Sequence, residues 1–344
     1  METVSKVKNK TAARKTMASK KKKYDKELLV SMFKEMALYR RFEERVLNAY
    51  TKQKFSGFCH VHIGQEGLCV GVQRALRDTD YMISGYRSHT QAIAKGITPN
   101  EVFAELLAKK TGCCGGKGGS MHMFSAEKRF YGGHGIVGGQ APIALGVGFK
   151  IKYQQEDDIM VCYLGDAAMN QGQVFEALNM AAAWDIPVLY VIENNRYGMG
   201  TDITRTTSLG KDGLYKRALG FDMACSQVNG QDVLATYEHV SSIVDQMRKD
   251  KKPYLLEALT YRYKGHSVSD PGLYRSKDEV KDYMENNDPI KNLSAVLLKE
   301  KFATEDDLKA WDKEAKELAK AAEKFAEESP EPDVSERLTD VLAD

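Results

Sequence analysis

The sequence contains no run of about 18 apolar residues, so no segment is long enough to cross a membrane as a helix. Its six cysteines form no C-x-x-C pair and show no zinc-ligand spacing, which argues against a zinc or disulfide framework and favours reduced thiols. The body of the chain also lacks an excess of basic residues. Residues 1–23 hold nine Lys or Arg and one acidic residue, a net charge of +8. Since the whole chain has a formal net charge of +2, the remaining residues carry a net charge of −6. The folded part is therefore not expected to bind nucleic acid.

The basic segment 1–23 has no apolar stretch of the kind found in secretory signals. We interpret it as a solvated, disordered arm. A bacterial-type cytoplasmic location is expected, with an organelle matrix as the alternative if the arm is a transit peptide. Residues 24–344 are expected to form a single α/β domain with a helical C-terminal extension.

The clearest regular unit is a strand–helix–strand crossover. Residues 159–164 and 187–192 are short apolar runs, and residues 173–184 between them place apolar side chains on one helical face. Such a crossover makes the two strands parallel, with a right-handed connection. A further strand is expected at residues 254–260, and helices at 25–52, 100–109, 233–248 and 305–328. The predicted fold is α/β, with a doubly wound, mostly parallel sheet flanked by helices.

Polar residues follow both strands of this crossover. The first strand runs into Gly165-Asp166, and the second runs into Asn194-Asn195. Because ligands collect at the carboxyl ends of parallel strands, Asp166 and Asn195 are expected to meet at one crevice. A carboxylate, an amide oxygen and a nearby backbone carbonyl suit Mg²⁺ carrying a diphosphate, and the amino end of the following helix favours phosphate. Either residue alone is explained by a helix cap or a turn, but the pair at this spacing favours a metal site.

The spacing from Gly165-Asp166 to Asn194-Asn195 resembles the signature of thiamine diphosphate enzymes. Other segments resemble, in the same order, the α subunits of 2-oxo acid dehydrogenases (E1) of the pyruvate type. The resemblance runs from about Leu28 to Asp288. Seven motifs carry it: GFCHVHIGQEG (57–67), YRSH (86–89), GKGGSMHMF (116–124), GGHGIVGGQ (132–140), QGQVFEALNM (171–180), ENNRYGMGT (193–201) and YRYKGHSVSDPG (261–272).

This resemblance implies the diphosphate-type domain of the thiamine diphosphate-binding fold. It also implies oxidative decarboxylation of pyruvate with thiamine diphosphate and Mg²⁺, followed by reductive acetylation of the lipoyl group of an E2 acyltransferase. In this family a glutamate of the β subunit activates the cofactor, and the chain is too short for the fused single-chain form. An α2β2 heterotetramer is therefore the implied assembly, and the chain is expected to be active only with β.

The resemblance places Mg²⁺ and the diphosphate at one end of the site. The implied metal ligands are Asp166, Asn195 and the backbone carbonyl of Tyr197. The implied cofactor contacts at this end are Tyr86, Arg87, Ala167 and Ala168. The planar guanidinium of Arg87 suits bidentate contact with phosphate.

Ala167 departs from the family pattern, which has a glycine at this position. A residue with positive φ would resist the added methyl group. The turn after Asp166 is therefore expected to lie in an ordinary backbone region.

The other end of the site is implied to hold the aminopyrimidine and the reacting atoms. Gly135 is expected to contact the ring through its backbone, and Val137 to act as an apolar wedge that keeps the cofactor bent. His60 and His266 are the implied catalytic residues, and His266 lies on a loop that also reaches the phosphate.

The loop after residue 260 bears on regulation and substrate. A serine at the position of Ser267 is phosphorylated in regulated eukaryotic relatives, and added charge there would repel the cofactor or disorder the loop. Branched-chain relatives typically carry two histidines where Gly265-His266 stand, which favours pyruvate here. Acetoin and branched-chain 2-oxo acid dehydrogenases remain the alternatives, since the β subunit forms part of the pocket.

Two other motifs point to different classes of protein. Residues 133–138 match G-x-G-x-x-G, but no apolar strand is expected before them, so a nicotinamide-binding site is disfavoured. Residues 112–118 approach a P-loop but have Gly118 where Ser or Thr is needed. A noncatalytic subunit that has lost its cofactor is disfavoured because the implied metal ligands are all present.

Overall fold

The computed structural model describes residues 24–210 and 213–340, so the predicted basic arm 1–23 lies outside the described residues. Six parallel strands form one sheet, in the order β2-β1-β3-β4-β8-β7. The predicted α/β fold with a parallel sheet is thus confirmed. The strands are β1 (Tyr81–Gly85), β2 (Phe130–His134), β3 (Met160–Gly165), β4 (Val188–Asn194), β7 (Ala224–Asn229) and β8 (Tyr254–Leu259).

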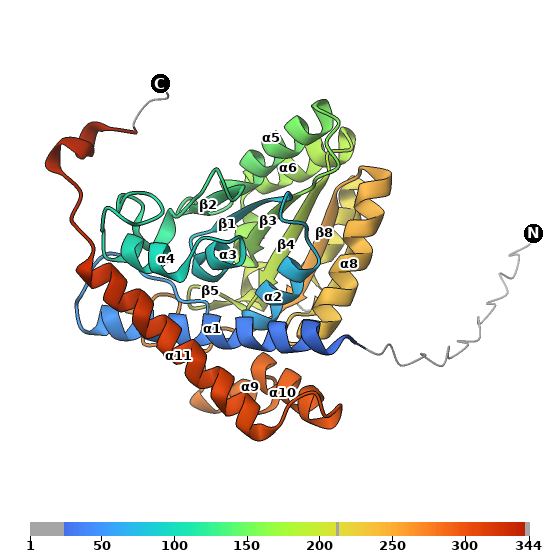
Figure 1. Ribbon diagram of the computed structural model, residues 1–344. Helices are drawn as coiled ribbons and strands as arrows, with labels where there is room; N and C mark the ends of the chain where they lie inside the picture. The colour runs from blue at the N-terminus through green and yellow to red at the C-terminus, as the bar shows by residue number, and fades with distance from the viewer. Residues whose placement is uncertain (1–23, 211–212, 341–344) are drawn as a thin grey trace, which may run out of the picture.

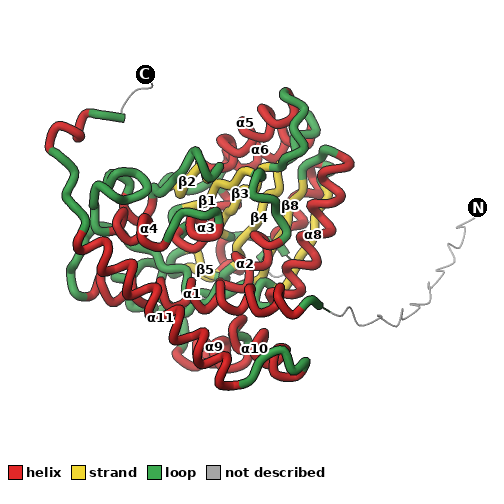
Figure 2. The backbone as a smooth tube through the Cα atoms, in the orientation of Figure 1, coloured by secondary structure: helices red, strands yellow, loops and turns green. Residues whose placement is uncertain are grey.

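Helices cover both faces of this sheet, as Figures 1 and 2 show. A small antiparallel hairpin of two short strands, β5 (Tyr197–Gly198) and β6 (Thr201–Asp202), lies outside the sheet. The α-helices are α1 (Lys26–Thr51), α2 (Glu66–Arg74), α3 (His89–Ala94), α4 (Pro99–Leu106), α5 (Gln140–Tyr153), α6 (Gly172–Ala183), α7 (Ile203–Thr206), α8 (Val233–Asp250), α9 (Lys277–Asn286), α10 (Pro289–Lys299) and α11 (Glu305–Glu328). Among the described residues, none of these helices has the length and apolar character that a membrane crossing requires.

The central strands are buried on both faces because their side chains alternate between two hydrophobic clusters. In β4, Leu189 and Val191 join the cluster that lies beneath α1, α4 and α8. Val188, Tyr190 and Ile192 join the opposite cluster, beneath α5 and α6. This burial on both sides explains why β3 and β4 read as continuous apolar runs in the sequence.

Most predicted elements are present, with small shifts at their ends. The helix expected at residues 100–109 is α4, which begins one residue earlier than expected. Its cap is Thr98, whose side chain accepts from the backbone N–H of Glu101 in a capping box. The helix ends early because Ala108 adopts a positive φ of 54°.

Strand β2 corrects a second prediction. It runs directly into the G-x-G-x-x-G segment, although no strand was expected there. Only Phe130 at its start is a buried apolar residue; Tyr131 is exposed, and Gly132 and Gly133 have no side chain. The hydrophobic pattern therefore could not reveal this edge strand. Because a strand does precede the G-x-G-x-x-G segment, a nucleotide site can no longer be disfavoured for lack of one.

The order of the strands determines where a ligand can bind. From β1 the chain passes first to β2 on one side and then to β3 on the other, so the connections leave β1 and β3 in opposite directions. Such a switch point opens a crevice at the carboxyl ends of the two strands. Tyr86 and Arg87 follow β1 at this edge, and Asp166 follows β3.

Helix α5 offers a test of its packing against the sheet. A Cβ atom at Gly148 would lie 2.6 Å from methyl groups of Ile186 and Val188. A Cβ atom at Gly146 would have no neighbouring atom within 4 Å. We expect Gly148→Ala to destabilise the fold by about 1–3 kcal/mol through overpacking. The matched control Gly146→Ala should stabilise by about 0.5–1 kcal/mol, since glycine is a poor helix former. Denaturant unfolding of both variants measures the difference; equal midpoints would contradict the packing described here.

Candidate active site

A cavity of about 610 Å³ lies at the carboxyl ends of the strands. This volume falls in the range of small-molecule and cofactor sites. Segments that follow β1, β2, β3, β4 and β8 all contribute to its wall. The structure brings together every site residue predicted from the sequence: His60, Tyr86, Arg87, Gly135, Val137, Asp166, Ala167, Ala168, Asn195, Tyr197 and His266.

The three predicted metal ligands lie in adjoining turns. β3 and β4 pair in parallel up to Gly165 and Glu193, which brings the turns that follow them side by side. Nη1 of Arg262 lies 2.6 Å from both Asn195 Oδ1 and the backbone carbonyl oxygen of Tyr197. Because one nitrogen reaches both atoms, the two oxygens lie near each other, and Arg262 holds them in place. The turns after β3 and β4 thus bring hard oxygen atoms to the same part of the site.

Asp166 is a buried carboxylate with one oxygen unpaired in the part of the chain that the structure describes, as expected of a cation ligand. Its side chain is only 3% exposed, and its Oδ2 atom has no hydrogen-bond partner among the described residues. Burial raises its pKa to about 6, partly offset by the positive charge of Arg262 and by nearby backbone amides. An orphaned carboxylate oxygen in a turn beside the one that presents the Asn195 and Tyr197 oxygens fits Mg²⁺.

Arg262, which follows β8, was missed by the sequence analysis. It is almost completely buried, and its Nη2 atom also donates to the carbonyl of Met199 at 2.6 Å and to the Tyr274 hydroxyl at 2.8 Å. Its position just beyond a strand's carboxyl end was the available signal, but it lies inside a motif read only for His266 and Ser267.

Arg87 also reaches the cavity from a buried position. Its guanidinium donates to the carbonyl oxygens of Val61, at 2.6 Å, and His266, at 2.7 Å. Burial and the charge of Arg262 lower its pKa. Neither arginine forms an ion pair with a carboxylate in the described part of the chain. Two buried, uncompensated guanidinium groups at one cavity favour an anionic ligand such as a diphosphate.

The turn at Ala167 has the ordinary backbone that was predicted. Ala167 begins a short 3-10 helix, η2 (Ala167–Asn170), and is not among the residues with positive φ. Its methyl group packs toward Gly198, where an added Cβ would lie 2.6 Å from the Cβ of Ala167. The extra methyl is therefore accommodated because the facing residue has no side chain.

The segment after β2 forms another wall of the cavity. Gly135 lies against the loop before it: a Cβ at Gly135 would be 3.0 Å from Nε2 of His122. Val137 lines the cavity and is partly exposed, and its neighbour Ile136 is 75% exposed. An apolar side chain beside a bare backbone is the arrangement that a flat heterocycle needs.

The two predicted catalytic histidines lie next to each other. The ring centres of His60 and His266 are 5.1 Å apart, and the His60 ring is 4.5 Å from that of Tyr86. Burial and the charge of Arg87 lower the pKa of His60 to about 2 and that of His266 to about 4. Both rings are therefore neutral near pH 7, able to accept as well as donate hydrogen bonds.

The lowered pKa of His60 predicts how stability depends on pH. The unfolded chain takes up a proton near the ordinary value of 6.5, but the folded chain does so only near 2. Stability is therefore highest above pH 6.5 and is lost as the pH falls through this window, with His266 adding to the loss down to about 4. We expect His60→Asn to flatten this dependence, as measured by unfolding midpoints at about pH 5 and 7. A variant with an unchanged slope would contradict a buried neutral His60.

A buried polar network supports the cavity from behind. Glu193 lines the cavity, and its Oε1 atom lies 2.9 Å from His62 Nε2 and 3.0 Å from Gln91 Nε2. The sequence analysis did not single out these residues. Ser267 also lines the cavity, with its hydroxyl 3.0 Å from that of Ser269; its phosphorylation is a hypothesis that rests on the resemblance alone.

Comparison with known proteins shows which family the chain belongs to. A model of the family described as "Dehydrogenase E1 component" matches residues 34–335. The chain is 45% identical over 340 residues to the pyruvate dehydrogenase E1 component subunit alpha of Rhizobium meliloti, covering 96% of this chain and 97% of that protein. It is 46% identical to the protein of the same name from Rickettsia felis, with coverages of 94% and 98%. The mitochondrial pyruvate dehydrogenase E1 component subunit alpha of Dictyostelium discoideum is 45% identical, and the match covers 92% of this chain and 83% of that protein.

Proposed function

The chain belongs to the dehydrogenase E1 component family, and from this we propose that it is the α subunit of a pyruvate dehydrogenase. Together with a β subunit, it decarboxylates pyruvate oxidatively and passes the acetyl group to the lipoyl arm of an E2 acyltransferase. Enzymes of this family depend on thiamine diphosphate. The observation that carries the proposal is the cavity in which an orphaned buried carboxylate, two neighbouring oxygens and two buried arginines meet.

Three residues would hold Mg²⁺ in this site: Asp166 through its carboxylate, Asn195 through its side-chain oxygen and Tyr197 through its backbone carbonyl. Arg87 and Tyr86 would contact the diphosphate, with the backbone at Ala167 and Ala168 beside them. Arg262 supports this end by fixing the positions of the Asn195 and Tyr197 oxygens. The negative charge of the diphosphate would in turn compensate the two arginines.

At the other end, Gly135 and Val137 would hold the aminopyrimidine. When bound, the cofactor supplies a carbon nucleophile and takes up the electrons released as CO₂ leaves. The neutral rings of His60 and His266 would orient the substrate's oxygen atoms and move protons there. Phe58 and Met199 also line the cavity as apolar side chains at its solvent-exposed rim.

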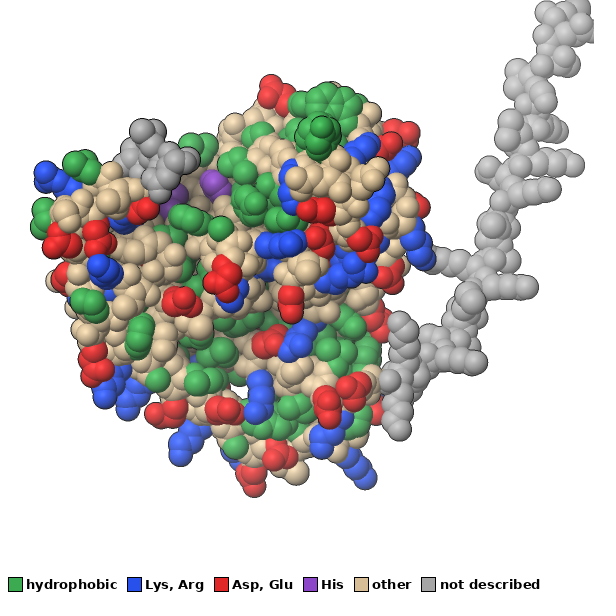
Figure 3. Space-filling model, turned by 45° about the horizontal axis from the view of Figure 1, so that its top comes forward, with side chains coloured by type: hydrophobic (Ala, Val, Ile, Leu, Met, Phe, Trp, Pro, Cys, Tyr) green, Lys and Arg blue, Asp and Glu red, His purple; other side chains and the backbone are tan. Residues whose placement is uncertain are grey.

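Exposed apolar residues, at the mouth of the cavity and elsewhere on the surface, support the proposal of a β partner. Phe58 and Ile136 are 69% and 75% exposed near its mouth. A second group, Phe149, Tyr153 and Trp184, lies on α5 and just after α6, and its rings pack against one another in the solvent. Figure 3 shows clusters of hydrophobic side chains on the face of the molecule that it displays. Such patches are typical of subunit interfaces, and we propose the α2β2 heterotetramer. A bacterial-type cytoplasm remains the proposed location.

The test is co-expression with the β subunit, followed by decarboxylation assays over pyruvate, 2-oxobutyrate, branched 2-oxo acids and acetoin. Pyruvate should give the highest kcat/KM, and activity should require thiamine diphosphate, Mg²⁺ and β together. A preference for a branched 2-oxo acid or acetoin would overturn the substrate assignment. Full activity of the α chain alone would overturn the proposed dependence on β.

A further inference from the structure

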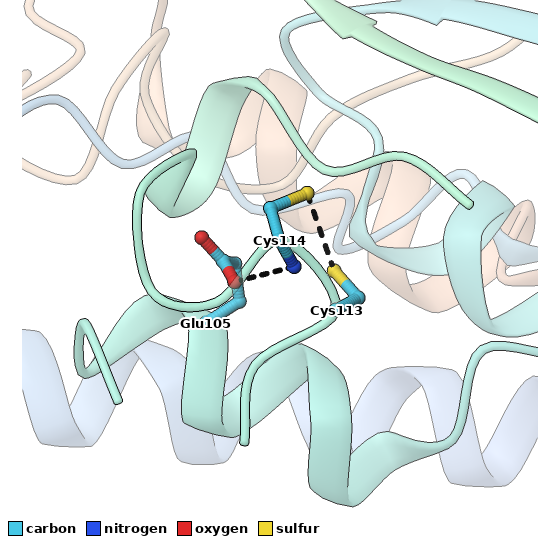
Figure 4. A group of neighbouring side chains, drawn as sticks. All are labelled: Glu105, Cys113 and Cys114. Atoms are coloured by element: carbon cyan, nitrogen blue, oxygen red, sulfur yellow. Dashed lines mark hydrogen bonds between the residues drawn. The ribbon is translucent and has the colours of Figure 1, made fainter. Parts of the chain in front are cut away.

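Two adjacent cysteines outside the cavity form an unusual pair. Cys113 and Cys114 lie in the loop between α4 and β2, both are free thiols, and their Sγ atoms are 3.9 Å apart (Figure 4). Cys113 packs against the main hydrophobic core. The side chain of Cys114 points toward the segment at residues 122–124. Its sulfur donates to the carbonyl of His122 at 3.4 Å and accepts from the backbone N–H of Phe124 at 3.3 Å.

A metal site is the first interpretation of this group, because Glu105 lies beside the two thiols (Figure 4). The carboxylate, however, is already saturated. Its Oε2 accepts from the backbone N–H groups of Cys114 and Gly116, at 2.8 and 2.9 Å. Its Oε1 accepts from those of Gly118 and Gly119, at 2.7 and 3.1 Å. Four donors occupy the four lone-pair positions of a carboxylate, so Glu105 organises the loop and is not available to an ion.

The contact between the two sulfurs and the hydrogen bond from the Phe124 N–H give the two thiols different pKa values. The hydrogen bond with Cys113 and the amide N–H of Phe124 lower the pKa of Cys114, while the same thiol contact and then burial raise the pKa of Cys113. Cys114 is therefore the thiol that ionises first, and its neighbour keeps its proton. A thiolate beside a protonated thiol is the arrangement found in dithiols that oxidise in two steps.

We propose that Cys113 and Cys114 form a reversible disulfide when hydrogen peroxide oxidises them. The Cys114 thiolate attacks one peroxide oxygen, breaks the O–O bond and becomes a sulfenic acid, and the released oxygen leaves as water after protonation. Cys113 then attacks the sulfenic sulfur, its proton leaves with the hydroxyl group as a second water, and the S–S bond forms. The two thiols lose two electrons and two protons, which reduce one peroxide to two waters.

The geometry makes this disulfide easy to reduce. Neighbouring Cα atoms are about 3.8 Å apart across a trans peptide, shorter than the roughly 4.4–6.8 Å usual for bridged cysteines. The resulting strain raises the reduction potential, and strained disulfides are the labile ones. The bridge therefore acts as a reversible modification and contributes no permanent support to the fold.

The loop connects this pair to the cavity. Forming the bridge draws the Cys114 sulfur away from His122 and Phe124, and so frees the segment that begins at residue 121. Met121 lines the cavity, and His122 lies against Gly135, the backbone wall proposed for the aminopyrimidine. Oxidation should therefore weaken the binding of thiamine diphosphate. This consequence rests on the proposed function, whereas the disulfide itself does not.

The experiment uses the chain assembled with its β subunit and treated with hydrogen peroxide, then blocked with N-ethylmaleimide and digested. The peptide containing both cysteines should lose two hydrogen atoms and carry no maleimide, and a reducing agent should restore both thiols. The apparent Kd for thiamine diphosphate should rise several-fold on oxidation and return on reduction. Cys114→Ser should bind the cofactor normally before and after peroxide, with Cys225→Ser as the matched control that behaves like the parent.

Each other outcome contradicts a defined part of the proposal. Irreversible oxidation of one cysteine, or maleimide on both after peroxide, overturns the disulfide. A disulfide that leaves the Kd unchanged overturns the link to the cavity. If the parent binds no thiamine diphosphate at all, the proposed function fails, yet the mass measurement still decides on the disulfide.

Discussion

The Asp166→Asn variant, assembled with its β subunit, should bind thiamine diphosphate and Mg²⁺ very weakly and lose kcat/KM by on the order of 10²–10³-fold. Asp166 supplies the only negative charge among the three proposed metal ligands, and its Oδ2 atom has no partner among the described residues. The amide keeps the shape of the side chain but removes the charge. Cofactor affinity, followed by quenching of intrinsic fluorescence, and steady-state rates would measure the two effects.

Asp157→Asn is the matched control for this prediction. Asp157 precedes the same strand at its opposite end, where it forms exposed ion pairs with Arg77 and Lys251. Exposed pairs contribute little, about 0–1 kcal/mol, so this variant should bind the cofactor and turn over like the parent. If Asp166→Asn matched the control in both measurements, the proposed metal site would be wrong.

Arg262→Gln should be the most destabilising of the substitutions discussed, by about 1–3 kcal/mol for each buried acceptor that it leaves unpaired. The change removes a buried charge and leaves the oxygens of Asn195, Tyr197 and Met199 without their donor. Cofactor affinity should fall as well, because two of these oxygens are proposed metal ligands. Arg262→Lys should recover only part of the loss, since one ammonium group cannot span the positions that the planar fork reaches.

Arg196→Gln provides the comparison for Arg262. Arg196 lies close in sequence to the same ligands but is partly exposed, and its ion pairs with Asp202 and Glu279 are long, at 3.6 and 3.4 Å. Its loss should change stability by no more than about 0.5 kcal/mol. Denaturant midpoints and thiamine diphosphate titrations of the three variants test the series; an Arg262→Gln chain as stable as Arg196→Gln would show that the buried contacts are dispensable.

Local patterns in the sequence predicted the parts of this protein that depend on local order. The strands β3 and β4 are continuous apolar runs because both of their faces are covered, and α6 between them shows a helical period. Parallel strands end at one edge of a sheet, so Asp166 and Asn195 could be placed together from the sequence alone. The roles of His60, Tyr86, Arg87, Gly135 and Val137 came only from resemblance to a family, since no periodicity marks them.

Residues that act through distant contacts could not be found in this way. Arg262 reaches Asn195 across 67 positions of the chain, and His62 reaches Glu193 across 131. Strand β2 carries too few apolar side chains to be recognised, and it exists because β1 offers it an unpaired edge. Such contacts form only when the whole sheet is assembled.

The sequence by itself determined the α/β class, the crossover and the acidic and amide turns at its ends, because hydrophobic period and strand direction are local properties. Only the tertiary structure decided which buried charges meet at those turns, where the neutral histidines face each other and why Ala167 fits beside Gly198. The physical reason is that burial, and with it the protonation and pairing of a polar group, depends on every element packed around that group and on no single segment.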